Sequence, residues 1–526
     1  MRPPLPPSLP VVRKDRPAIA DRLAFSRWRP RARRIAIGGL VALALTAIGA
    51  GLLIWTPFDR PDRPALGRHR IAVLPLANRS PDPSDEYFAD GMTEELISTL
   101  SRIPGLEVTA RTSIMQYKGK ETSVADVGRQ LNVGSVLEGS VRKAGTKVRA
   151  TATLIDVATQ AHLWSEDYEG ELAAIFAIQA KIAQRVTRAL NGQPVAAGKP
   201  SGRTGPAPDT EAYTLYLKGR YYLNRETPES LKTSVEYFAQ AIRRDPTSAR
   251  AYSSLAGVHL LYGLRNVLPP KQDFPEAEAA AARALEIDQD LPDAHATLAA
   301  VKLLYEFDWP GAERGFRRAL VLDRGNVRTL LWYALFLRAM GRFDEAIAAA
   351  TRARELDPLS VRASAAVGWT LLFARRYDEA LDEFRKTLAS DPNFFDARSG
   401  LGWTLLMKRM LEQAVSEMEK AVALSGGDAG LTGDLGYALG IAGRRVEARS
   451  ILEKLERRSM EEYVPAYAMA EVSVALERYT GAFEWLDRAY AERSNYLWQA
   501  RVDPAWDRLR GDPRFTALLK KLHLPQ

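Results

Sequence analysis

The pattern of apolar and polar residues begins with one long run that contains no charge. Residues 35–55 are apolar or small across 21 positions. A helix rises about 1.5 Å per residue, so this run would span roughly 30 Å, the thickness of a bilayer core. The pattern therefore predicts a single transmembrane helix at 35–55. It would be preceded by a tail at 1–34 and followed by a Pro-containing juxtamembrane spacer at 56–69.

The tail at 1–34 is strongly basic. It holds ten Lys or Arg residues and two Asp residues, so it accounts for +8 of the net charge of +9 of the whole chain. Basic residues before an apolar span resist translocation, which predicts a cytoplasmic N-terminus and contact with the lipid bilayer through 35–55. A cleaved signal peptide is the alternative. Because the rest of the chain is nearly neutral, we expect no nucleic-acid partner.

Small residues recur every fourth position along the predicted span. They are Gly38, Ala42, Thr46 and Ala50. Small residues at this spacing let two membrane helices approach closely, so the row is a candidate dimer face and a homodimer is possible. An Ala-rich segment also produces such a row by chance.

Residues 70–190 combine strand and helix patterns. A short apolar run begins at Ile71, and Phe88, Met92 and Leu96 then recur at helical spacing. Ser123 and Asp126 fit the cap of a further helix. Residues 148–154 alternate apolar and polar side chains, as half-buried strands do, and a long amphipathic helix closes the segment. The expected order βαβαβββα predicts a small α/β domain.

The residues of this domain carry a resemblance to a known family. The stretches IAVLPLANRSPDPSDEYFADGMTEELISTLSRIPGLEVTARTS, YKGK and VLEGSVRKAGTKVRATATLIDVATQAHLWSEDYEG resemble the TolB amino-terminal-like domain of bacteria. The resemblance implies an accessory or sensory domain without established catalytic residues. In relatives it often precedes tetratricopeptide repeats and follows an adenylate cyclase, a protein kinase or a winged-helix domain. Only 34 residues precede the predicted span here, so we expect no such module.

Beyond a Gly/Pro-rich linker at 191–209, the chain repeats with a period of 34 residues. The period appears in small residues, in the larger residues four positions later, and in glycines. These are Ala312, Ala346, Ala380, Ala414, Ala448 and Ala482; Phe316, Ala350, Phe384, Met418, Leu452 and Leu486; and Gly368, Gly402 and Gly436. This spacing is typical of tetratricopeptide repeats, which are stacked helix pairs. It predicts an all-α tetratricopeptide solenoid of about eight repeats at 210–500, closed by a helical cap at 501–526.

Repeats of this kind resemble one another in binding peptides or proteins along a concave face. In the usual pattern the ninth residue of each first helix lines that groove, which here selects Leu335, Trp369, Trp403 and Tyr437. This apolar row has no Lys or Asn to clamp a terminal carboxylate, and it suits a hydrophobic segment or an amphipathic helix. Arg328 and Arg362 would form a basic rim. The alternative is that the two Trp side chains only pack within the solenoid core.

Catalytic chemistry has no candidate in the sequence. The chain has no cysteine, and its five histidines are scattered without metal-ligand spacing. Known nucleotide-binding and hydrolase motifs do not occur. The adjacent acids Glu94 and Glu95 diverge by about 100° on a helix, so we expect them to be solvated or to lie near the helix N-terminus. The sequence predicts no enzyme, no cofactor and no metal.

These features favour a membrane-anchored scaffold that binds partner proteins through its repeats. The predicted location is the bacterial inner membrane, single-pass, with residues 56–526 periplasmic. The alternative is a sensory receptor that relays to a separate cytoplasmic regulator. A third hypothesis, an adenylate-cyclase-related protein without its own catalytic domain, has the least support.

Overall fold

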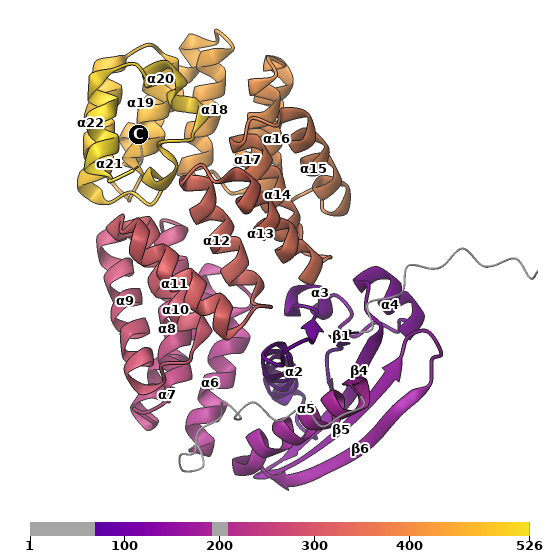
Figure 1. Ribbon diagram of the computed structural model, residues 1–526. Helices are drawn as coiled ribbons and strands as arrows, with labels where there is room; N and C mark the ends of the chain where they lie inside the picture. The colour runs from indigo at the N-terminus through magenta and orange to yellow at the C-terminus, as the bar shows by residue number, and fades with distance from the viewer. Residues whose placement is uncertain (1–68, 192–208, 525–526) are drawn as a thin grey trace, which may run out of the picture. The chain divides into compact units, whose positions relative to one another are not determined.

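The computed structural model describes residues 69–191 and 209–524. The α/β domain occupies the first range and a helical array occupies the second. Figure 1 labels the elements of both in chain order. The residues of both described ranges belong to one compact unit. The described structure is therefore a mixed-sheet domain followed by an all-helical array.

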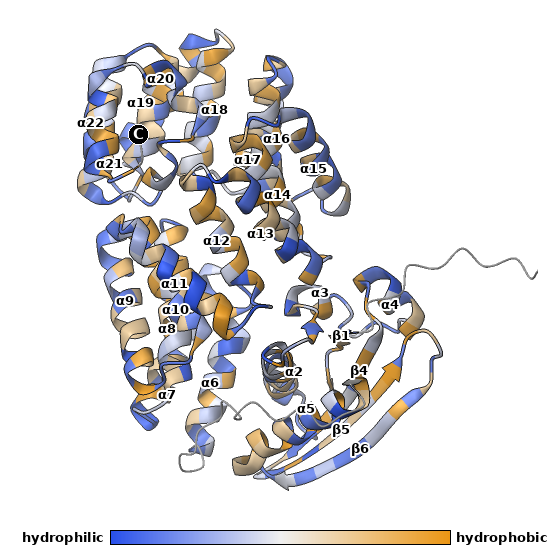
Figure 2. Cartoon of the chain, viewed as in Figure 1, coloured by the Kyte–Doolittle hydropathy of each residue, from blue (hydrophilic) through white to orange (hydrophobic). Residues whose placement is uncertain are grey.

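The predicted transmembrane helix has no counterpart among the described elements, and this part of the predicted fold class is corrected. None of the helices within 69–191 and 209–524 is long and apolar enough to cross a membrane, and none of the labelled helices is apolar along its whole length (Figure 2). The longest of them, α9 (Pro270–Ile287), has 18 residues and contains Lys271, Asp273 and Arg283. Such a helix is too polar for a bilayer core.

The predicted single-pass inner-membrane location is corrected on the same finding. It lacks support in the part of the chain that the structure describes. The run at 35–55 and the candidate dimer face Gly38, Ala42, Thr46 and Ala50 lie outside the described residues.

The α/β domain is built on one mixed sheet with strand order β3-β1-β4-β5-β6, and β2 pairs with β4. β1 pairs in parallel with β3 and β4, whereas β4, β5 and β6 are antiparallel. The elements are β1 (Arg70–Val73), β2 (Ala77–Asn78), η1 (Pro83–Asp85), α2 (Glu86–Ser101), β3 (Glu107–Val108), α3 (Arg111–Met115), α4 (Val124–Leu131), β4 (Ser135–Ala144), β5 (Lys147–Asp156), β6 (His162–Glu171), η2 (Leu172–Ala174) and α5 (Ile175–Asn191). The structure adds β2 and α3 to the predicted order.

Alternation along the strands decides which helices cover which face. Val148 and Leu154 share a core with residues of α2 and α5. Ala72 and Val136 face the other side and pack against α3 and α4. The Ser123 side chain caps α4 by accepting a hydrogen bond from the Asp126 backbone, as predicted.

The array consists of consecutive helix pairs, α6 with α7 through α20 with α21, which make eight pairs within the described residues. Their bounds are α6 (Thr210–Leu223), α7 (Pro228–Arg244), α8 (Ala249–Leu264), α9 (Pro270–Ile287), α10 (Pro292–Val301), the π-helical turn η3 (Lys302–Glu306), α11 (Trp309–Leu322), α12 (Val327–Ala339), α13 (Phe343–Leu356), α14 (Val361–Phe373), α15 (Tyr377–Ser390), α16 (Phe395–Met407), α17 (Leu411–Leu424), α18 (Ala429–Ile441), α19 (Arg445–Arg458), α20 (Ala466–Ala475) and α21 (Tyr479–Glu492). After them come η4 (Leu497–Gln499), η5 (Pro504–Leu509) and α22 (Pro513–Lys521).

The residue types of the 34-residue period follow from how the helices cross. The side chain of Phe384 is fully buried and lies between Gly368 and Gly400. A Cβ added at Gly368 would be 2.8 Å from the Phe384 ring, and one added at Gly400 would be 2.2 Å from it. Both glycines are needed because the aromatic ring occupies the space of their side chains. Phe384, one of the larger residues of the period, thus fills the space between its own helix pair and the next.

Candidate functional site

The four residues predicted to line the groove lie on the first helices of four successive pairs, α12, α14, α16 and α18. Trp403 and Tyr437 are only 5% and 3% exposed, and their rings stack at 5.2 Å. Leu335 and Trp369 are half-buried, and the Trp369 ring meets Phe384 edge-on at 5.7 Å. The row thus has an accessible end, at Leu335 and Trp369, and a closed end.

The two predicted rim arginines stand beside the accessible end. Each lies seven residues, or two helical turns, before its row residue, so both share its face. Arg328 and Arg362 are exposed. An Arg362 Nη2 atom lies 3.1 Å from Glu226 Oε2, with 61% of the arginine side chain exposed. Leu335, Trp369, Arg328 and Arg362 are called the open half of the groove below.

The closed end of the row is covered by the chain itself. Residues 494–512, called the C-terminal segment below, return to the array after its last helix pair. The amide of Asn495 donates to the carbonyl of Gly263 at 3.0 Å, and Arg501 donates to the carbonyl of Met340 at 2.7 Å. These acceptors belong to the α8 and α12 pairs, early in the array. The C-terminal segment, which overlaps the predicted cap at 501–526, therefore contacts repeats that are distant from it in the sequence.

Most of the C-terminal segment is buried. Eleven of its residues are less than 9% exposed, namely Ser494, Asn495, Leu497, Trp498, Ala500, Val502, Asp503, Pro504, Ala505, Trp506 and Leu509. Trp506 Nε1 donates to the Tyr467 hydroxyl at 2.6 Å, and that hydroxyl donates to Asp503 Oδ2 at 2.7 Å. The Tyr437 hydroxyl lies 3.5 Å from the Ala505 carbonyl. Access to Tyr437 therefore requires movement of this segment.

Arg338 of α12 also contacts the C-terminal segment. Its guanidinium lies 4.7 Å from the ring centres of both Phe373 and Trp498, so it is held between an array ring and a ring of the segment. Its Nε atom is buried without a hydrogen bond. Burial lowers the pKa of Arg338 to about 10, against the attraction of Asp396 and Asp503.

Three acidic residues lie on the elements that meet at the closure of the array. Asp434 belongs to α18, Glu471 to α20 and Asp503 to the segment. Burial raises the pKa of Asp434 to about 7 and that of Asp503 to about 6, and it raises the pKa of Glu471 well above its usual range, with the neighbouring carboxylates adding to the effect at Asp434 and Glu471. Sequence reasoning missed Glu471, although it follows Tyr437 by 34 residues and continues the row.

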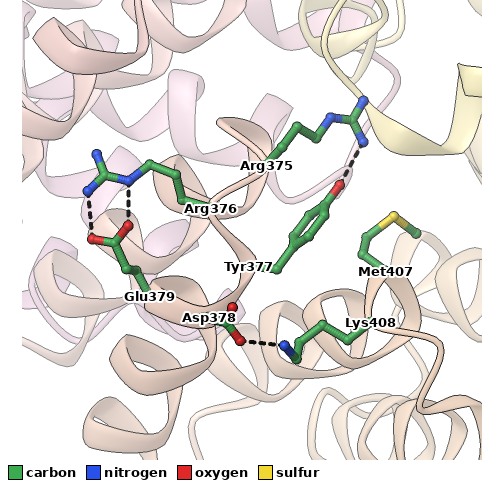
Figure 3. Close-up of a pocket in the computed structure, with 7 residues that line it drawn as sticks. All are labelled: Arg375, Arg376, Tyr377, Asp378, Glu379, Met407 and Lys408. Atoms are coloured by element: carbon green, nitrogen blue, oxygen red, sulfur yellow. Dashed lines mark hydrogen bonds and ion pairs between the residues drawn. The ribbon is translucent and has the colours of Figure 1, made fainter.

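A polar pocket of about 330 Å³ lies near the turn between α14 and α15 (Figure 3). Its basic residues are all paired. Arg376 contacts Glu379 at 2.6 Å and Lys408 contacts Asp378. Arg375 lies 3.2 Å from the Tyr377 hydroxyl and also 2.8 Å from Asp507 of the C-terminal segment. The pocket therefore offers no unpaired cation to an anion. One of its arginines, Arg375, instead binds the C-terminal segment.

The array also binds the α/β domain through buried acids that the sequence suggested were solvated. Glu94 and Glu95 of α2 are each only 8% exposed. Glu94 contacts Arg111 and, at 2.8 Å, Arg220 of α6. Glu95 lies 2.6 Å from Arg250 of α8. The expectation of solvated acids is wrong, because their partners come from a distant part of the chain.

The interface continues as a shared hydrophobic core. Met92 and Leu96 of α2 belong to the same buried cluster as Leu217 of α6 and Phe238 of α7. A Cβ added at Gly91 would be 2.7 Å from Leu217, so α2 and α6 pack closely. The two predicted domains therefore share one core.

A second contact lies at the turn between α13 and α14. Ser113 of α3 donates to Asp357 from both its backbone and its hydroxyl. The backbone of Ala110 donates to the Leu356 carbonyl at 2.8 Å.

Within the described residues, no group of three or more His, Asp or Glu side chains is arranged to hold a metal ion. The candidate site consists of contacts within the protein, which join the α/β domain, the array and the C-terminal segment.

Comparison with known proteins supports the repeats. Residues 297–361 and 366–429 match the tetratricopeptide repeat family, which confirms the prediction from the 34-residue period. Residues 67–185 match the second domain of HilA/YgeH-like transcriptional regulators. The predicted resemblance of this domain to the TolB amino-terminal-like domain is not shown by these matches.

Similar proteins cover only parts of the chain. "Putative adenylate cyclase 3" of Rhizobium meliloti is 35% identical over 259 residues, which are 47% of this chain and 44% of that protein. "Transcriptional regulator HilA" of Salmonella typhimurium is 24% identical over 30% of this chain and 28% of its own. The chain spans less than half the length of these curated relatives. The solved structure of PilF from Pseudomonas aeruginosa is 22% identical, with 44% of this chain and 98% of that chain covered and a TM-score of 0.32.

Proposed function

We propose that this protein is an interaction scaffold whose repeats bind a partner protein across the open half of the groove. The observation that carries the proposal is that Leu335 and Trp369 are half-buried at equivalent positions of successive repeats, each with an exposed arginine two turns before it. Tetratricopeptide repeats support a role in protein interaction. Repeats of this kind are typically not catalytic, and we propose no enzymatic activity.

The chemistry of the open half selects the kind of partner. Leu335 and Trp369 offer apolar surface, and Arg328 and Arg362 offer positive charge at its edge. The pair between Arg362 and Glu226 is solvent-exposed, so it contributes little and can exchange for a partner's carboxylate. The partner we propose is an amphipathic helix with an apolar face and flanking acidic residues.

Site-specific photocrosslinking on the full chain tests this proposal. A photoreactive residue at Leu335 should capture a partner, whereas the same residue at Leu424, which is 42% exposed on α17, should not. The affinity of the captured partner should then fall about 2- to 5-fold in Arg362→Ala, because an exposed charge pair contributes about 0.5–1 kcal/mol. The matched control is Arg385→Ala, at an exposed arginine of α15. Equal capture at both sites, or equal affinity of both variants, would contradict the proposal.

A regulatory role for the α/β domain is a second candidate. The names of both curated relatives belong to regulation or signalling. In this chain Glu94 and Glu95 link α2 directly to α6 and α8, so a change in one part would reach the other. If partner binding to the open half leaves hydrogen exchange in α2 and α3 unchanged, this candidate fails.

A further inference from the structure

Three acidic side chains of the C-terminal segment and of the helices beneath it, Asp434, Glu471 and Asp503, form no ion pair within the described residues. Glu471 is 4% exposed, and its carboxyl makes no hydrogen bond or ion pair with the residues that the structure describes. Asp434 accepts a hydrogen bond from Ser399 at 3.1 Å, and Asp503 accepts two, from the Tyr467 hydroxyl at 2.7 Å and from the Ala505 backbone at 2.9 Å. A buried carboxylate without a cation is costly, so such a group takes up a proton instead.

The third carboxyl is brought by the C-terminal segment itself. Asp434 and Glu471 belong to array helices, but Asp503 joins them only when residues 494–512 are in place. Docking of the segment therefore buries Asp503 against α20, where Glu471 is also buried, while Asp434 of α18 is half-buried. We propose that the C-terminal segment is a proton-dependent latch. It closes the array while these carboxyls hold protons, and it withdraws when they ionise.

Other titratable and charged groups face this cluster from every element around it. They are Asp428 and Tyr437 of the α18 repeat, Tyr467 of α20, Tyr496, Asp507, Arg508 and Arg510 of the C-terminal segment, Arg338 of α12, and Arg375 after α14. The cations nearest to Asp503 have other partners. Arg375 and Arg510 both contact Asp507 at 2.8 Å, and Arg338 lies between two rings. They weaken the repulsion at Asp503 but leave Glu471 without a counter-charge.

The direction of the effect follows from the two states. With the segment withdrawn, the carboxyls are in water and ionise near their ordinary pKa values. In the closed state burial raises the pKa of each group. Closure is therefore favoured at acidic pH and weakened as pH rises through about 6 to 7. Each unit of difference in pKa changes the ratio of closed to open forms about tenfold.

Opening of the latch would lengthen the accessible groove. Trp403 and Tyr437 continue the row of Leu335 and Trp369, and withdrawal of the segment uncovers Tyr437 first because its hydroxyl faces the Ala505 carbonyl. The use of this longer groove by a partner rests on the proposed function. The proton-dependent movement itself does not.

Hydrogen–deuterium exchange of the full chain between pH 5.5 and pH 8.5 tests the latch. After correction for intrinsic exchange, protection of amides in 494–512 should fall at least about tenfold over this range, while amides of α12 and α14 stay protected. In Glu471→Gln the fall should be smaller, because one carboxyl no longer ionises. The matched control Glu484→Gln, at an exposed acid of α21, should follow the unchanged protein.

Two results would overturn the latch. One is constant protection of 494–512 across this range, and the other is parallel loss in α12 and α14, which would mean unfolding of the whole array. Asp503→Asn provides a second variant, since the asparagine oxygen can still accept one of the two bonds, from Tyr467 or from the Ala505 backbone. If both neutral variants behave as the unchanged protein does, the cluster is not the sensor. A failed latch leaves the open half of the groove, and so the proposed function, untouched.

Discussion

Ser113 and Asp357 are joined by two hydrogen bonds although 244 residues separate them. The Ser113 backbone lies 2.8 Å from Asp357 Oδ1, and its hydroxyl lies 2.6 Å from the same atom. Burial raises the pKa of Asp357, and the bonds from Ser113 act against that rise. The five-residue helix α3 of the α/β domain is thus held by the turn between two repeats.

Removal of the Ser113 hydroxyl should weaken this contact. Ser113→Ala leaves a buried carboxylate with one donor fewer, so the free energy of unfolding should fall by roughly 1–3 kcal/mol. Chemical denaturation measures the loss. Ser450→Ala, at an exposed serine of α19, is the control and should change stability by less than about 0.5 kcal/mol. Equal stability of the two variants would show that α3 is not held by this bond.

Glu94 should be among the most sensitive charged residues of the α/β domain. Glu94→Ala leaves Arg220 and Arg111 without their shared carboxylate, and both side chains are 27% exposed. Loss of one partner of a buried pair costs about 3–5 kcal/mol, which partial exposure reduces, so we expect roughly 2 kcal/mol. Thermal unfolding of Glu94→Ala against Glu121→Ala, at an exposed acid, measures the difference. An unaltered melting temperature in Glu94→Ala would contradict the interface.

Two glycines should respond in opposite directions to the same substitution. Gly400→Ala places a Cβ against the buried Phe384 ring and should destabilise the array by about 1–3 kcal/mol. Gly481 of α21 has no atom within 4 Å of an added Cβ, so Gly481→Ala should stabilise by about 0.5–1 kcal/mol. Denaturation of both variants checks the pair. Stabilisation by Gly400→Ala would refute the close crossing of helices at Phe384.

Asp503 should make stability depend on pH in a defined direction. Its pKa is raised from 3.8 to about 6 in the folded protein. Its stabilising contribution is therefore complete below pH 4 and is lost as pH rises through about 6. The free energy of unfolding, taken relative to Asp503→Asn, should fall by on the order of 2 kcal/mol between pH 4 and pH 8. Denaturation at several pH values measures this difference, and a rise in place of a fall would contradict the burial of the carboxyl.

The 34-residue period by itself determined the array and the packing of its helices. The spacing selects Ala380, Phe384 and Gly368, and the structure buries all three. This succeeds because each repeat contacts its neighbours in the same way, so packing leaves a periodic trace in the sequence. Alternation along 148–154 likewise determined a strand with one buried face.

The contacts of the array with the α/β domain and with the C-terminal segment follow only from the three-dimensional structure. The sequence suggests that Glu94 is a solvated acid, but the folded chain pairs it with Arg220. Asp503 looks like a residue of a turn in the sequence, but the folded C-terminal segment brings it to Tyr467. These contacts join parts of the chain that are distant in sequence and occur once, so no period records them. Whether a charged or aromatic side chain is free or buried depends on which distant segment covers it, and that is settled only when the chain folds.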